Sequence, residues 1–73
     1  MDKKQIRVKD VIENVMGFVC YGINKEGLHY VQCRTDLLKI ADYQFMEELG
    51  AKPIKFNDYR TRFYFDEGVE VID

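Results

Sequence analysis

The chain has 73 residues, of which 47% are hydrophobic and 14% aromatic, and its formal charge at pH 7 is −2. A chain of this size buries only about 60% of its unfolded surface, so we expect one domain over residues 1–73 with a thin core. The small net charge excludes a strongly basic nucleic-acid binder and a strongly acidic mimic of DNA. The sequence has no apolar run near the length of about 20 residues that spans a bilayer. It also has no signal-peptide pattern, so we expect a cytoplasmic protein without a membrane partner.

The first part of the chain predicts a tail, a short strand and a short helix. Residues 1–5 form a charged segment that we expect to be frayed. Residues 6–9 alternate apolar and polar side chains, which indicates a strand. Asp10 is placed to cap a helical turn over residues 10–16, with Glu13 three residues later. Gly17 is placed to end that helix.

Residues 17–34 predict a β-hairpin around which the rest of the chain is organised. Two runs rich in β-branched and aromatic residues flank Lys25-Glu26-Gly27, and a loop of this kind has its glycine at positive φ. In the resulting register Ile23 faces His29 and Val19 faces Cys33. The face expected to lie on the core carries Val19, Tyr21, Ile23, His29, Val31 and Cys33. The other, mixed face carries Phe18, Cys20, Gly22, Asn24, Leu28, Tyr30, Gln32 and Arg34. The two cysteines therefore lie on opposite faces and cannot bond to each other.

Residues 37–49 are predicted to form the main helix. Thr35 or Asp36 is the expected cap, and Gly50 is expected to end the helix. The apolar stripe expected to pack on the hairpin consists of Leu37, Leu38, Ala41, Phe45 and Leu49. A second apolar edge consists of Ile40, Tyr43 and Met46. This edge either adds core packing or binds a partner.

The C-terminal third returns to the alternation of β-strands. Residues 54–57 and 62–66 alternate, which places Phe63 and Phe65 on the face opposite Arg62 and Tyr64. Residues 57–60 and 66–68 have turn composition, and residues 69–72 form a last strand. We therefore predict an α+β domain, in which one antiparallel sheet is covered on one face by the main helix, with the helix of residues 10–16 at its edge.

The residues that common catalytic and metal sites need are missing or badly spaced. The chain contains no serine, and His29 is its only histidine, so a Ser-His-Asp triad is excluded. His29 and Cys33 lie about 13 Å apart at the rise of a strand, too far for proton transfer. Two cysteines on opposite faces and one histidine do not make a tetrahedral metal site. We predict a non-enzymatic protein without metal or cofactor.

Candidate binding residues occur as a basic and aromatic set and as a mixed apolar set. The first set consists of Arg34, Lys55, Tyr59, Arg60, Arg62 and Tyr64. Such residues are favoured at protein interfaces, and on a sheet they also stack on bases and neutralise phosphates. An ordinary solvated face, a protein-binding surface and a nucleotide or nucleic-acid surface remain alternatives. The second set, on the open hairpin face, consists of Phe18, Cys20, Leu28 and Tyr30 and favours a homodimer.

Two resemblances bear on function. Gly17-Phe18-Val19 and Tyr30-Val31-Gln32 resemble the hairpin that opens a GIY-YIG nuclease domain. Val19 replaces the tyrosine of the first motif, Gln32 replaces the last glycine, and the catalytic Glu and Asn of such domains have no counterpart, so we do not expect a nuclease. Residues 6–13, the hairpin and the Thr-Asp-Leu-Leu helix start resemble small uncharacterised accessory proteins of bacteriophages and mobile elements. That resemblance implies a protein-binding inhibitor of a host defence protein, as anti-CRISPR proteins are, acting in the host cytoplasm.

Overall fold

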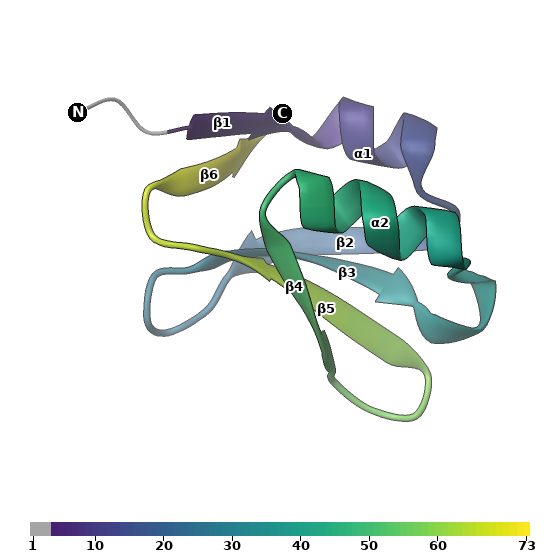
Figure 1. Cartoon of the computed structure of the whole chain (residues 1–73). Coiled ribbons are helices and arrows are strands. Elements are labelled where there is room, and N and C mark those ends of the chain that lie inside the picture. Colours follow the sequence, from purple (N-terminus) through teal and green to yellow (C-terminus); the bar gives the residue numbers. More distant parts are fainter. Residues whose placement is uncertain (1–3) are drawn as a thin grey trace.

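The structure is a computed structural model and describes residues 4–73 (Figure 1). Its elements are β1 (Lys4–Arg7), α1 (Val8–Asn14), β2 (Phe18–Ile23), β3 (His29–Arg34), a 3₁₀ turn (Thr35–Leu37), α2 (Ile40–Glu48), β4 (Ala51–Lys55), β5 (Arg60–Phe65) and β6 (Val69–Ile72). The mixture of helix and sheet agrees with the predicted α+β class. A four-stranded antiparallel sheet has the order β2-β3-β5-β4, and β1 and β6 form a separate parallel pair. The expectation of one antiparallel sheet is therefore wrong for the two terminal strands.

The predicted hairpin is present, with one shift of register. Ile23 pairs with His29 as predicted, and Gly27 has φ +85° with its N–H donating to the Asn24 carbonyl at 3.0 Å. An irregularity between Phe18 and Cys20 then places Phe18, and not Val19, opposite Cys33. Because one extra residue in a strand reverses the faces beyond it, Phe18 turns to the covered side and packs against the core.

The core lies on one side of the four-stranded sheet. Figure 1 shows α2 across this face, with α1 and the β1–β6 pair on the same side. The fully buried residues come mainly from β3, β5 and α2; they are Phe63, Phe65, Met46, Val11, Val31 and Cys33. Val19, Tyr21 and Ile23, which we expected in the core, are exposed. They lie on β2, at the edge of the sheet, and the burial is concentrated at its middle strands.

The main helix is shorter than predicted, and its buried face agrees with the prediction in part. It begins at Ile40 and not at residue 37, after the 3₁₀ turn Thr35–Leu37. Most of the predicted stripe packs against the core, namely Leu38, Phe45 and Leu49. Leu37 and Ala41 are exposed instead, and Met46 of the second apolar edge is fully buried. Tyr43 packs against Phe63 with ring centroids 5.6 Å apart, and Ile40 is exposed. Two of the three residues of the second apolar edge thus contribute core packing.

The start of α2 is capped by a residue that the sequence reasoning missed. The Asp42 carboxylate accepts a hydrogen bond from the Lys39 N–H at 3.0 Å, and Asp42 is buried. Neither Thr35 nor Asp36 caps this helix. The Thr35 hydroxyl instead lies 2.8 Å from the Thr61 hydroxyl, which joins the 3₁₀ turn to β5.

The N-terminal elements are shifted by two residues toward the start of the chain. The strand ends at Arg7 and not at residue 9, and α1 begins at Val8, so Asp10 lies in its first turn and does not cap it. Lys4 and Gln5, which we placed in a frayed tail, belong to β1 and pair with β6; residues 1–3 lie outside the described residues. Gly17 has φ +82° at the turn into β2, as expected of a residue that ends the helical segment.

The last hairpin confirms the predicted alternation of faces. Along β5, Phe63 and Phe65 are buried, whereas Arg62 and Tyr64 between them are partly exposed on the other side. The strand before it is β4, Ala51–Lys55, and not residues 54–57. The uncovered side of the sheet therefore carries the basic and aromatic residues.

Candidate binding surface

The open face is the side of the four-stranded sheet that no other element of residues 4–73 covers. The strand registers arrange its side chains in rows. One row runs Gly22, Tyr30, Tyr64 and Lys52 across β2, β3, β5 and β4. The next row runs Cys20, Gln32, Arg62 and Ile54. In the third row Arg34 pairs with Arg60, whose carbonyl accepts a hydrogen bond from the N–H of Phe56. The strand positions of this face thus carry Lys52 and three arginines and no carboxylate.

Arg62 lies at the centre of the open face, where two aromatic rings and two hydrogen-bond acceptors contact its guanidinium. Its guanidinium carbon lies 3.9 Å from the centroid of the Phe56 ring and 4.3 Å from that of Tyr30. Its Nε donates to the Gln32 side-chain carbonyl at 2.8 Å, and its Nη1 donates to the Tyr64 hydroxyl at 3.2 Å. The hydrogen bond to Tyr64 is the largest cause of a raised pKa for Arg62. These contacts favour one orientation of the guanidinium in the absence of a partner.

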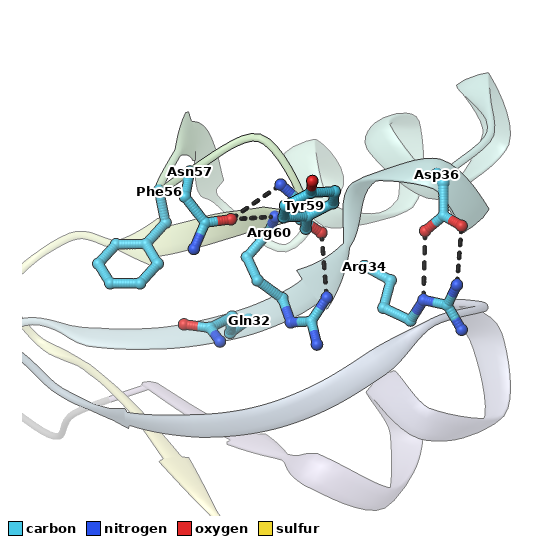
Figure 2. A pocket seen from close by; sticks show the side chains of 7 residues that line it. All are labelled: Gln32, Arg34, Asp36, Phe56, Asn57, Tyr59 and Arg60. Atoms are coloured by element: carbon cyan, nitrogen blue, oxygen red, sulfur yellow. Dashed lines mark hydrogen bonds and ion pairs between the residues drawn. The ribbon is translucent and has the colours of Figure 1, made fainter.

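A hollow of about 720 Å³ lies between the end of β3 and the β4–β5 turn (Figure 2). Its lining includes Gln32 and Phe56, which also contact Arg62. The Asn57 carboxamide oxygen accepts from the N–H groups of Tyr59 and Arg60 at 2.8 and 2.9 Å, which shapes the turn. The Arg34 guanidinium donates twice to Asp36, at 3.2 and 2.8 Å. The Arg60 guanidinium contacts only the carbonyl of Tyr59, at 3.2 Å, among the groups described here. Arg60 is therefore the guanidinium of this hollow with capacity for a ligand.

A second hollow of about 420 Å³ lies at the opposite end of the open face. Its lining consists of Asn24, Leu28, Lys52, Ile54, Tyr64, Phe65 and Asp66. Leu28 comes from the β2–β3 turn and Ile54 from the other edge of the sheet, so two sequence-distant apolar side chains meet here. The open face thus combines a basic centre with one polar and one largely apolar hollow.

Most of the predicted basic and aromatic set meets on this face. Arg34, Arg60, Arg62 and Tyr64 lie on its strands, and Tyr59, 74% exposed, lies on the rim of the first hollow. Lys55 does not join them, because it pairs with Thr61 and so lies on the other side of the sheet, where its ammonium is 3.9 Å from Asp58. The side-chain partners that the sequence reasoning missed are Gln32, Phe56 and Asn57. Strand alternation gave the face of Gln32 only, and the alternation predicted for residues 54–57 would put Asn57 opposite to Phe56. The β3–β5 and β4–β5 registers, with the turn after β4, bring these side chains to Arg62 and Arg60.

The predicted self-association set is divided by the structure. Cys20 and Tyr30 belong to the open face and Leu28 to its second hollow, whereas Phe18 packs against the core. The ring of Tyr30 already carries the guanidinium of Arg62 on its face and packs against Tyr64, with centroids 5.4 Å apart. This set therefore does not make one continuous apolar patch.

The two cysteines and the histidine lie in separate environments, and the contact of His29 supports the fold. Burial raises the pKa of the Cys33 thiol to about 12, whereas Cys20 is exposed, and both are free. His29 Nδ1 accepts a hydrogen bond from the Val71 N–H at 3.0 Å, which fastens β6 to β3. Residues 4–73 contain no group of three side chains suited to hold a metal ion. In the same residues no helix has the length and apolar character to cross a membrane.

No model of a known protein family, no curated protein and no solved structure matches this chain.

Proposed function

We propose that this protein is a non-catalytic binding protein that attaches to another protein through the open face. The observation that carries the proposal is the clamped guanidinium of Arg62, held between the rings of Tyr30 and Phe56. Binding normally costs the entropy of immobilising long side chains, and a side chain that is already fixed avoids this loss. Arginine and tyrosine are also the residues that most often dominate protein interfaces.

The charge of the open face indicates the chemistry of the partner. Its strands carry Lys52, Arg34, Arg60 and Arg62 without a carboxylate, while the whole chain has a charge of −2. The rest of the molecule is therefore acidic, and the face stands out as a basic area. Opposite potentials across an interface speed encounter and orient the partners. The partner should present acidic side chains toward Arg60 and apolar ones toward Leu28 and Ile54.

A nucleotide or single-stranded nucleic acid is the second candidate. The observation that favours it is the first hollow, which combines Arg34, Arg60 and the exposed ring of Tyr59. Bases bind such surfaces by stacking on uncovered aromatic rings. The faces of Tyr30 and Phe56 are occupied by Arg62, so a base would first have to displace this guanidinium. For this reason a protein partner fits the open face better.

The resemblance to small bacteriophage proteins adds an inhibitory role to this proposal. A protein that covers a functional surface of its partner blocks it without any chemistry of its own. Assays of the captured partner with and without added protein test this step. An unchanged activity of the partner at saturating protein would contradict inhibition and leave the binding proposal intact.

The experiment for the binding proposal is affinity capture from a bacterial lysate treated with nuclease. The wild-type chain, Arg62→Ala and Lys9→Ala are compared; Lys9 is an exposed lysine on α1, away from the open face. We expect one protein to be captured by the wild type and by Lys9→Ala and to be lost with Arg62→Ala. Equal capture by all three would contradict a role for the open face.

Salt dependence separates the two candidates. The affinity of a single-stranded nucleic acid falls with salt with a logarithmic slope of about −0.7 per neutralised phosphate. A protein interface with a few charge pairs has a much shallower slope. Titration of a labelled oligonucleotide and of the captured protein at several salt concentrations measures both. Tight, steeply salt-dependent oligonucleotide binding that Arg60→Ala weakens would favour the second candidate.

A further inference from the structure

The two edges of the four-stranded sheet differ in chemistry. The edge strand β4 contains Lys52, Pro53 and Lys55 within five residues. The other edge strand, β2, contains no charge and no proline over its six residues, Phe18–Ile23. Lysine and proline are among the devices that stop a sheet edge from pairing with another chain. By this criterion β4 is protected, and β2 is protected only by its irregularity between Phe18 and Cys20.

Backbone direction shows which groups β2 offers at its free edge. In an antiparallel pair, alternate residues bond to the neighbouring strand. Asn24 donates its N–H to the Leu28 carbonyl at 2.9 Å, so the residues two and four positions earlier, Gly22 and Cys20, also bond toward β3. The N–H and C=O groups of Tyr21 and Ile23 therefore point outward, and β3 is the only strand paired with β2 in residues 4–73.

The outer edge of β4 is less suited to pairing than that of β2. Phe56 donates its N–H to the Arg60 carbonyl at 2.9 Å, so Ile54 bonds toward β5 and Pro53 faces outward. Proline has no N–H, so the outer edge of β4 has a gap in its middle where an added strand would need a donor.

Apolar side chains accompany the free backbone groups of β2. Val19, Tyr21 and Ile23 are exposed along this strand, and Ile23 is 59% exposed. Ile12 and Met16, in the segment just before β2, are exposed as well. The Tyr21 hydroxyl donates a hydrogen bond to the Asp73 carboxylate, so one charged group lies near this edge. An unpaired edge with exposed apolar side chains is unfavourable in water and is the usual target of an added strand.

We propose that β2 pairs antiparallel with β2 of a second copy, which joins the two four-stranded sheets into one continuous sheet. An uncharged strand is complementary to an antiparallel copy of itself, as a two-fold symmetric interface requires. The pairing is centred on Gly22, so that Tyr21 of each copy lies opposite Ile23 of the other and four backbone hydrogen bonds form. This register keeps the irregularity near Phe18 outside the paired segment. Both open faces then lie on the same side of the dimer.

Sedimentation equilibrium of three chains tests the proposal. Ile23→Lys places a charge on the β2 edge, and Ile54→Lys places the same charge on the β4 edge, at a residue of similar exposure, 57%. We expect the wild type and Ile54→Lys to dimerise, and the dimer dissociation constant of Ile23→Lys to rise at least tenfold. A wild type that stays monomeric up to about 1 mM, the limit of weak association, would overturn the proposal. A dimer weakened by Ile54→Lys but not by Ile23→Lys would also overturn it.

Amide hydrogen exchange of the wild type provides a measurement that does not depend on a variant. The amides of Tyr21 and Ile23 are expected to exchange at least tenfold more slowly at high than at low protein concentration, because pairing protects them. Concentration-independent exchange at both positions would contradict the proposed edge. The tests of dimerisation and of partner binding can fail independently. Arg62→Ala should still dimerise, and Ile23→Lys should still capture the partner.

Discussion

Gly22 lies beneath the side chain of Tyr30, the residue opposite it on β3. A Cβ atom at position 22 would stand 2.8 Å from the Tyr30 hydroxyl oxygen and 3.0 Å from the ring carbon that carries this hydroxyl. Gly22 is not among the glycines with positive φ, so its place on the open face follows from the space that Tyr30 needs. Tyr30 in turn supports the guanidinium of Arg62. A glycine on an edge strand thus contributes to the geometry of the binding surface.

The first prediction follows from this contact. Gly22→Ala should lower the free energy of unfolding by about 1–2 kcal/mol, because the added methyl group displaces the ring of Tyr30. Urea denaturation measures the change. In a Tyr30→Ala background the same substitution should cost much less, because the conflicting ring is gone. An equal cost in both backgrounds would show that Tyr30 is not the cause.

The second prediction concerns the clamp on Arg62. Arg62→Lys keeps the charge but loses the planar contact with Tyr30 and Phe56 and the two hydrogen bonds, so we expect a loss of about 1 kcal/mol. Arg60→Lys is the matched control, since within residues 4–73 the Arg60 guanidinium bonds only to the Tyr59 carbonyl. Its unfolding free energy should stay within about 0.5 kcal/mol of the wild type. Equal losses for the two variants would contradict the clamp.

The third prediction is a loss of stability at alkaline pH caused by Cys33. Its pKa in the folded protein is about 12, above the ordinary value of 9.0, so the unfolded chain releases this proton first. The stability that Cys33 contributes is therefore complete below pH 9 and is lost as the pH rises toward 12. The wild type should lose up to about 1.4 kcal/mol per pH unit more than Cys33→Ala in this window.

Thiol labelling at neutral pH checks that Cys33 is buried. Iodoacetamide should label Cys20, which is exposed, and should leave Cys33 unmodified in the folded protein. Mass spectrometry after proteolysis identifies the labelled residue. Rapid labelling of Cys33 under native conditions would contradict both its burial and the predicted pH dependence.

The fourth prediction concerns the start of α2. Asp42→Ala removes the acceptor of the Lys39 N–H and should lower the free energy of unfolding by about 1–2 kcal/mol. Asp42→Asn keeps an oxygen acceptor and should lose less. Gln44→Ala, an exposed substitution on the same helix, serves as the control and should be nearly neutral. Thermal or urea unfolding followed by circular dichroism gives all three values.

The fifth prediction concerns the attachment of β6. His29→Leu leaves the N–H of the buried Val71 without an acceptor and should cost about 1–3 kcal/mol. In His29→Asn the side-chain oxygen can take the place of Nδ1, and most of the stability should return. Urea denaturation compares them, and faster hydrogen exchange at Val71 in His29→Leu alone would locate the effect. Identical stabilities of the two variants would contradict this role.

Local sequence patterns determined the hairpin, the α+β content and the alternation along β5. A loop of Lys25-Glu26-Gly27 determines its own register, and alternate apolar residues give Phe63 and Phe65 a different face from Arg62 and Tyr64. These are properties of a few neighbouring residues, so one sequence is enough to infer them. The same patterns correctly placed the two cysteines on opposite faces.

Only the tertiary structure decided which of these residues work together. The irregularity at Phe18, the parallel pairing of β1 with β6 and the burial of Asp42 and Met46 depend on contacts between segments far apart in the chain. So does the clamp, in which β3, β5 and the residue after β4 meet around Arg62. Apolar periodicity indicates which side chains can be buried, but the elements that pack on the sheet decide which of them are buried. In the described residues no element buries Val19, Tyr21 and Ile23 at the sheet edge, so these side chains stay exposed.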